Sequence, residues 1–195
     1  MTGPSTPSAH PAALSAVAAL SAWAPPDDAQ GVLRDRYCAV LRARPDAVSR
    51  SCQPEHVTAS ALVLSHDGAR VLLGLHRKVG RWLQMGGHLE PADRSLAEAA
   101  RREAYEESGV AGLALLAGGP VRLDAHPVRC AGSDAPVSVH LDVQYAAIAP
   151  RGAIEQVSEE SLALAWYAPA DLPRDSDDSV RRLVEAALRR RAALG

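Results

Sequence analysis

The sequence of 195 residues lacks a marked excess of charge of either sign, because 21 Lys and Arg side chains oppose 23 Asp and Glu side chains. A domain that binds nucleic acid through its charge is normally strongly basic, so this balance argues against a nucleic acid polymer as partner. The chain also lacks an apolar run long enough to span a membrane. With 47% hydrophobic and 23% charged residues, its composition is that of an ordinary globular protein.

Cysteine is scarce and widely spaced. The three cysteines are Cys38, Cys52 and Cys130, and they form neither a CxxC pair nor a Cys/His group with the spacing of a zinc site. We therefore expect free thiols in a reducing compartment. The segment from Met1 to His10 contains no Lys or Arg, which a secretory signal needs before its apolar part. These absences predict a cytoplasmic protein.

The chain divides into three unequal parts. Residues 1–11 are rich in Pro, Ser, Thr and Gly, which predicts a disordered tail. Residues 12–55 are expected to form a helical extension, because apolar positions recur at helical spacing and Pro25 and Pro45 interrupt the pattern. Residues 56–195 are expected to form the main domain. A DNA-binding helix-turn-helix is the alternative for the extension, and the near-neutral charge weighs against it.

Within the main domain, short apolar or alternating segments bounded by turn residues predict strands. A C-terminal helix is expected after Ser176 or Asp177, either of which could cap it. The expected strands are residues 57–64, 70–75, 121–125, 137–147 and 162–167.

The segment from Val137 to Ala147 has the clearest strand pattern, with apolar residues on one face and Ser138, His140, Asp142 and Gln144 on the other. A strand covered on both faces is normally apolar on both, so we expect His140 and Asp142 to line a binding cleft. His126 and His140 could each be a metal ligand, although isolated strand histidines more often have a structural role.

The most informative segment begins with two glycines, Gly86 and Gly87, and continues into a helix. Ser95 is the expected N-cap of this helix, and Glu98 three residues later completes a capping box. Gly109 provides the C-terminal stop. The helix is therefore expected to begin just after Ser95 and to end just before Gly109.

Three carboxylates, Glu103, Glu106 and Glu107, fall within one arc of this helix. Like charges at this spacing each cost about 0.2–0.5 kcal/mol on a free helix. A hard divalent cation would reverse that cost, since Mg²⁺ prefers carboxylate oxygens and bridges to substrate phosphates. Arg102 is adjacent and could hold one carboxylate by a bidentate pair. A solvated acidic face is the alternative interpretation of the same charges.

The order of the residues favours the first interpretation. Arg102-Glu-Ala-Tyr-Glu-Glu-Ser-Gly-Val110, preceded by Gly86-Gly-His-Leu-Glu-Pro91, resembles the Nudix box, G-x5-E-x7-R-E-U-x-E-E-x-G-U with U apolar. Two departures from that pattern occur. Asp93 fills the first acidic position, and eight residues instead of seven separate it from Arg102. We interpret the additional residue as an insertion in the loop before the helix, where it is tolerated.

This resemblance covers about residues 56–190 and implies an α/β/α sandwich around a mixed sheet. The implied activity is Mg²⁺- or Mn²⁺-dependent hydrolysis of a nucleoside diphosphate linked to another group. In that family pattern the Gly86 carbonyl, Glu103, Glu106 and Glu107 are the metal ligands. The catalytic residues are Glu103, as the candidate to activate water, together with Glu107 and Arg102, the structural partner of a box carboxylate. Glu159 or Glu160 is the alternative general base.

The implied substrate is a small nucleotide-type diphosphate. Arg77 and the single lysine Lys78 lie just before the glycines and could bind its phosphates, and Trp82 could form a pocket wall or pack in the core. Two alternatives stay open: a catalytically silent, nucleotide-binding regulatory module, and an enzyme like isopentenyl-diphosphate isomerase, which would need a nucleophilic cysteine. No membrane partner is expected, and a homodimer is compatible with the sequence.

Overall fold

The structure is a computed structural model that describes residues 11–129 and 137–195. Most of the expected tail and Cys130 lie outside these residues. The helices are α1 (Pro11–Ala22), α2 (Asp28–Ala43), the short 3-10 helix η1 (Pro45–Val48), α3 (Leu96–Ser108) and α4 (Asp178–Ala192). The strands are β1 (Glu55–Leu64), β2 (Val71–His76), β3 (Trp82–Leu83), β4 (Met85–His88), β5 (Ala114–Leu115), β6 (Arg122–Val128), β7 (Ser138–Ile148) and β8 (Ser161–Tyr167).

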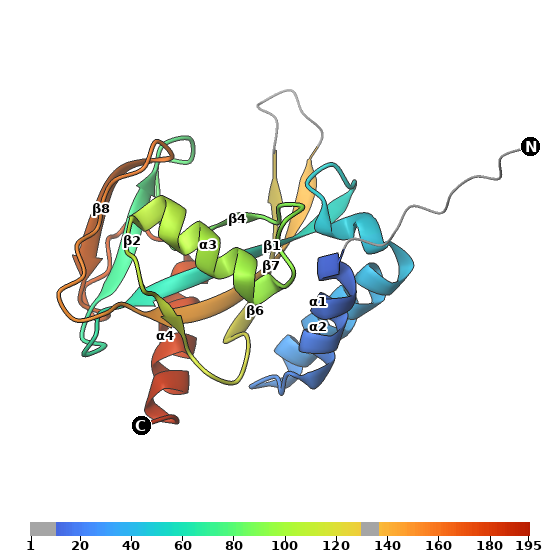
Figure 1. Ribbon diagram of the computed structural model, residues 1–195, viewed down its shortest axis with the longest axis horizontal. Coiled ribbons are helices and arrows are strands. Elements are labelled where there is room, and N and C mark those ends of the chain that lie inside the picture. Colours follow the sequence, from blue (N-terminus) through green and yellow to red (C-terminus); the bar gives the residue numbers. More distant parts are fainter. Residues whose placement is uncertain (1–10, 130–136) are drawn as a thin grey trace, which may run out of the picture.

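All the strands belong to one mixed sheet, with β1 and β7 paired in parallel at its centre. Their register runs without interruption from Glu55 opposite Val139 to Leu64 opposite Ile148. The remaining strands pair antiparallel: β2 and β4 with β1, β5 and β6 with β7, and β3 and β8 with β2. Helix α3 crosses one side of the sheet and α4 lies on the other (Figure 1). The α/β sandwich expected from the sequence is thus confirmed.

Strand β1 shows how the sheet supports two cores. Its residues Val57, Ala59, Ala61 and Val63 are fully buried in a cluster that also contains residues of α1, α2 and α3. On the opposite face, Leu62 and Leu64 are buried against α4. The same face carries polar residues, His56, Thr58 and Ser60, in the first half of the strand. Polar side chains therefore gather where the apolar α4 core ends.

Helix α3 begins and ends as expected. The Ser95 side chain accepts a hydrogen bond from the Glu98 amide at 3.1 Å, and Gly109 ends the helix with φ of 67°, a conformation that favours glycine. The Glu98 carboxylate accepts from the Arg94 amide, one residue before the expected position. Alanines on the inner side of α3 have no exposed surface, so the helix packs close to the sheet.

The N-terminal extension packs against an edge of the sheet, where β6 pairs with β7 alone among the strands that the structure describes. The amide of Gln30 on α2 donates to the carbonyl oxygen of Leu123 at 3.1 Å and accepts from the Leu123 N–H at 2.7 Å. The Tyr37 hydroxyl donates to the carbonyl of Asp124 at 2.7 Å. Among the described residues, no helix is both long and apolar enough to cross a membrane.

Candidate active site

Helix α3 and strand β4 approach each other closely because β4 contains two glycines. A Cβ atom at Gly87 would lie 2.8 Å from a carboxylate oxygen of Glu103, and one at Gly86 would lie 2.6 Å from the Ser60 Cα atom on β1. The N–H of Gly86 donates to Glu107 at 3.4 Å. Glycine at both positions therefore lets β4 fit between a neighbouring strand and the carboxylates of α3.

Arg102 holds the first residues of this site in place. Its guanidinium donates to both oxygens of Asp93, at 3.2 and 2.9 Å, in a bidentate pair. It also donates to Glu103 at 3.0 Å and to Glu106 at 2.8 Å, and its Nη2 atom donates to the His88 carbonyl oxygen at 3.0 Å. Asp93 is buried, so the aspartate and the additional loop residue still deliver a carboxylate to the arginine.

The carboxylate cluster, Glu103, Glu106 and Glu107, is graded in exposure. The Glu103 side chain is 14% exposed and that of Glu106 is 51% exposed, whereas residue Glu107 is 8% exposed. Burial raises the pKa of Glu103 to about 7, although Arg102 opposes the shift. Burial and the charge of Glu103 raise the pKa of Glu107 to about 8. Two buried carboxyl groups that repel each other suit a divalent cation, which would favour their ionised forms.

The segment before β8 lies near this cluster. The negative charge of Glu160 contributes to the raised pKa of both Glu103 and Glu107. Arg77 ties the segment to the turn after β2: its backbone N–H donates to the Glu160 carbonyl at 2.9 Å, and its guanidinium donates to the Glu159 carbonyl at 2.9 Å. Of Glu159 and Glu160, the two candidates for an alternative general base, Glu160 therefore interacts electrostatically with Glu103 and Glu107.

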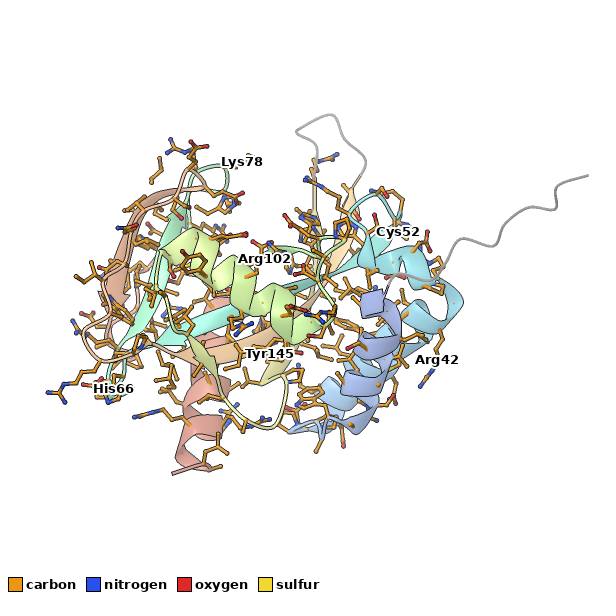
Figure 2. The ribbon with its side chains drawn as sticks, in the orientation of Figure 1. Arg42, Cys52, His66, Lys78, Arg102 and Tyr145 are labelled. Atoms are coloured by element: carbon orange, nitrogen blue, oxygen red, sulfur yellow. The ribbon has the colours of Figure 1, made fainter. Side chains whose placement is uncertain are left out.

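The expected substrate-binding residues lie in different surroundings. Arg77 binds backbone carbonyls of the β8 segment. Lys78 is exposed on the turn after β2, at the upper rim of the molecule and well apart from Arg102 on α3 in this view (Figure 2). The Trp82 ring meets Tyr167 edge-on at a centroid distance of 5.2 Å and packs against the α4 core. Trp82 thus contributes to packing, one of the two roles considered for it.

Asp142, on the polar face of β7, is 4% exposed. Its carboxylate accepts hydrogen bonds from Thr58 at 3.1 Å, Ser60 at 2.7 Å and Gln144 at 3.2 Å. Burial raises the pKa of Asp142 despite these bonds. The carboxylate thus links β1 to β7 inside the molecule, beneath the surface that we expected it to line.

His140 lies in a group that sequence reasoning missed. The histidine cluster, His56, His88 and His140, comes from β1, β4 and β7. His56 and His140 are direct partners in the parallel pair, and His126 on β6 lies opposite His140. The histidines are therefore not isolated. The alternation of side chains places His56 on the polar face of β1 and His140 on the polar face of β7. Only the register between the two strands brings the two histidines together.

Comparison with known proteins places this architecture in a family. The NUDIX domain matches residues 54–188. A NUDIX-family hydrolase from Clostridium perfringens is 26% identical, with a TM-score of 0.54 over 71% of this chain and 97% of that one. A MutT NUDIX hydrolase from Burkholderia pseudomallei is 25% identical, with a TM-score of 0.50 over 67% of this chain and 95% of that one.

A third structure, a C. elegans Ap4A hydrolase in a binary complex, shares the fold at 17% identity, with a TM-score of 0.54 over 71% of this chain and 96% of that one. Among curated proteins, no sequence matches this chain. The domain match nevertheless spans well over half of the chain and includes α3, β4 and the carboxylate cluster. The protein therefore belongs to the NUDIX family, as one of its pyrophosphohydrolases.

Proposed function

We propose that the protein hydrolyses the phosphoanhydride bond of a nucleoside diphosphate linked to another group, with Mg²⁺ or Mn²⁺ as cofactor. Water attacks one phosphorus of the diphosphate, the anhydride P–O bond breaks, and two phosphorylated products leave. One observation carries this proposal: the largely buried Glu103 and the buried Glu107 are held together against β4, although their charges repel. Such an arrangement costs stability unless a cation is bound there.

The residues present fit a divalent metal. Glu103, Glu106 and Glu107 would hold it through carboxylate oxygens, the ligands that Mg²⁺ prefers. The N–H of Gly86 donates to Glu107, so the Gly86 backbone lies beside the cluster and its carbonyl would complete the ligand set. A bound metal supplies neutralisation of the diphosphate charge and orientation of the attacking water.

The side chains themselves divide the remaining work. Arg102 fixes the position of Glu103 through a hydrogen bond while Asp93 fixes Arg102. Glu103 is the candidate to take a proton from water, because a bound metal would favour its ionised form and Arg102 fixes its position. Glu160 is the alternative base, because its charge acts on the same carboxyl groups from the β8 segment. Lys78, the single lysine of the chain, is exposed on the turn after β2 and stays the candidate to bind the phosphates through its charge.

The direct test is hydrolysis of a substrate panel with Mg²⁺ or Mn²⁺: ADP-ribose, dinucleoside polyphosphates, NADH, sugar nucleotides and modified dNTPs. We expect turnover of at least one compound, and we expect Glu107→Gln to remove most of it. Glu98→Gln is the matched control. It makes the same change on the same helix, and the amide oxygen of Gln can still accept from the Arg94 amide.

Tight binding of one panel compound without any turnover would instead support the regulatory module. Equal activity of Glu107→Gln and the unsubstituted protein would contradict the proposed role of the carboxylate cluster. Circular dichroism of both variants separates loss of chemistry from loss of fold.

A further inference from the structure

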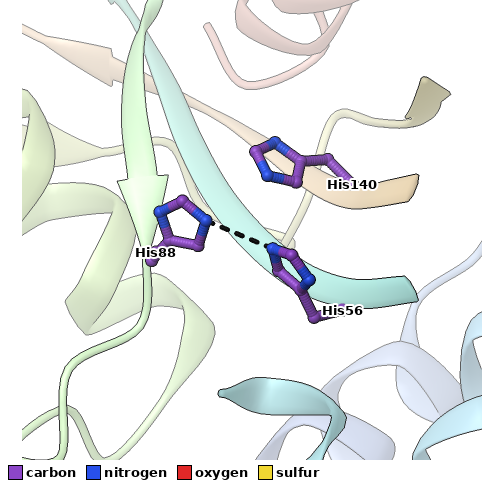
Figure 3. Close-up of side chains that lie close together, drawn as sticks. All are labelled: His56, His88 and His140. Atoms are coloured by element: carbon purple, nitrogen blue, oxygen red, sulfur yellow. Dashed lines mark hydrogen bonds between the residues drawn. The ribbon is translucent and has the colours of Figure 1, made fainter. Parts of the chain in front are cut away.

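Three imidazole rings, from β1, β4 and β7, lie close together on the polar face of the sheet. Their ligand nitrogens, one from each of His56, His88 and His140, all lie within 4.8 Å of one another. The Nε2 atoms of His56 and His88 are 3.2 Å apart, and Figure 3 shows His140 facing them from the neighbouring strand. Ring centroids lie 4.9–5.1 Å apart in the three pairs. The three nitrogens are thus close enough together for one ion to contact all of them.

The surroundings of His56 orient its ring. Its Nδ1 atom lies 3.1 Å from the Cys52 carbonyl oxygen, which can only accept, so Nδ1 carries the proton. The lone pair is then on Nε2, which accepts a hydrogen bond from Nε2 of His88. Zinc would replace this shared proton, and His88 would bind the ion as the tautomer protonated on Nδ1. Ser138 also contacts the Nδ1 atom, at 3.2 Å. A backbone carbonyl that fixes the tautomer of a histidine is the usual outer partner of a metal-binding imidazole.

We propose that His56, His88 and His140 bind one Zn²⁺ ion, at a site separate from the carboxylate cluster. Two nitrogens on one tetrahedral zinc, each at about 2.0–2.1 Å, lie ~3.3 Å apart, close to the 3.2 Å between His56 and His88. Imidazole nitrogen suits zinc, whereas carboxylate oxygen suits magnesium. Three protein ligands leave a fourth position for water or another molecule.

His126 is outside the proposed ligand set, although it lies opposite His140 on the neighbouring strand β6. Its Nδ1 atom lies 3.0 Å from a carboxylate oxygen of Asp124. His126 is therefore a neighbour of the cluster whose ring is already bound to a carboxylate.

Zinc would also stabilise the strand that lines the carboxylate cluster. His88 ends β4, directly after Gly86 and Gly87, and its carbonyl oxygen accepts from Arg102. An ion joining His88 to β1 and β7 would hold this end of β4 in place. The zinc proposal does not require pyrophosphate hydrolysis, so each can fail alone.

Zinc binding can be measured on the full chain after removal of metal with a chelator. The carboxylate cluster is first blocked with excess Mg²⁺, and Zn²⁺ is then titrated by calorimetry, with Co²⁺ absorption as a report on ligand geometry. We expect one equivalent to bind and to raise the unfolding temperature. His140→Gln should weaken binding by more than about 100-fold, since even outer partners of ligands are worth about 10–100-fold. His88→Gln provides the same test if His140→Gln does not fold.

A control variant sharpens this experiment. His126→Gln changes the neighbouring histidine and should leave zinc affinity within about threefold, because Nδ1 of His126 is bound to Asp124. The proposal is overturned if no zinc binds under Mg²⁺, or if His140→Gln and His88→Gln both bind it like the original chain.

Discussion

The carboxylate cluster and the histidine cluster lie on either side of one short strand, β4, but they are built in opposite ways. The first comes from three residues within five positions of one helix. The second comes from three strands, with His56 and His140 separated by most of the domain. The first is therefore visible as a sequence motif, whereas the second exists only through the pairing of β1 with β4 and β7.

Burial also acts on the two clusters with opposite sign. It favours the neutral form of every group, which is the protonated form of a carboxyl and the deprotonated form of an imidazole. Without metal, the carboxylate cluster therefore holds protons that its unfolded residues would release near neutral pH. The histidine cluster lacks protons that its unfolded residues would bind in mild acid. The two clusters are therefore suited to a cation in different ways, one through acids that repel each other and the other through neutral imidazole rings.

The largest expected effect separates the clusters by activity. Glu103→Gln should lower kcat at least about 100-fold, because general base catalysis contributes about 10²–10⁴-fold. The same variant should bind Zn²⁺ as tightly as the original chain in calorimetry under excess Mg²⁺. A loss of both properties in a folded variant would show that the two clusters form one site.

A second substitution tests the connection between the clusters. Arg102 contacts Asp93, Glu103, Glu106 and the His88 carbonyl. Arg102→Lys keeps the charge but cannot make the bidentate pair with Asp93, so we expect the free energy of unfolding to fall by about 1–3 kcal/mol. kcat should fall about tenfold, as is common when a supporting partner is lost. Denaturant unfolding and steady-state kinetics measure the two effects, and an unchanged kcat would contradict a positioning role.

The pH dependence of stability tests whether burial shifts the pKa values of the two clusters in opposite directions. The pKa of Glu107 is about 8 in the folded state against an ordinary value of 4.5, so the metal-free folded chain holds an extra proton between these pH values. Its free energy of unfolding therefore falls as pH rises from about 4.5 to 8. Glu107→Gln removes this dependence, and its unfolding temperature should exceed that of the original chain at pH 8 more than at pH 5.

The histidine cluster predicts the reverse trend in a more acidic range. The pKa of His140 is about 3 in the folded state against an ordinary value of 6.5, so the unfolded chain binds an extra proton between these values. The free energy of unfolding contributed by His140 therefore rises with pH over that range. His140→Gln, compared with the original chain by thermal unfolding without metal, should flatten the acid side of the stability profile.

The smallest effect on kcat and on zinc affinity is expected from a substitution outside both clusters. Gln30→Leu removes two hydrogen bonds to Leu123 at the edge of β6 and leaves its backbone groups without those partners. The free energy of unfolding should fall by about 1–3 kcal/mol in denaturant titration. Both kcat and zinc affinity should stay within about twofold under native conditions. A large loss of zinc affinity would show that the register of β7 depends on support from α2.

Local features were predictable because they depend on neighbours in the chain. The caps of α3 at Ser95 and Gly109 follow from short-range geometry, and the structure confirms them. The apolar face of β7 is also a local pattern, and its Leu141, Val143 and Tyr145 lie in one buried cluster. The NUDIX fold was predictable through the motif that begins at Gly86. Long-range features were not: two partners of Asp142, Thr58 and Ser60, lie more than eighty residues away on β1, and the histidine cluster needs the β1–β7 register.

The side chain of Gln30 has a consequence for how this protein is handled. A sheet edge with unpaired N–H and C=O groups is a template for a further strand, including one from another copy of the chain. The Gln30 side chain forms hydrogen bonds with both the N–H and the C=O of Leu123, so a further strand cannot pair with these groups. The family match begins at residue 54, beyond α1 and α2. A truncation at that boundary would keep the NUDIX domain but expose unpaired backbone groups of β6, which favours aggregation. Studies of catalysis should therefore use the longer chain.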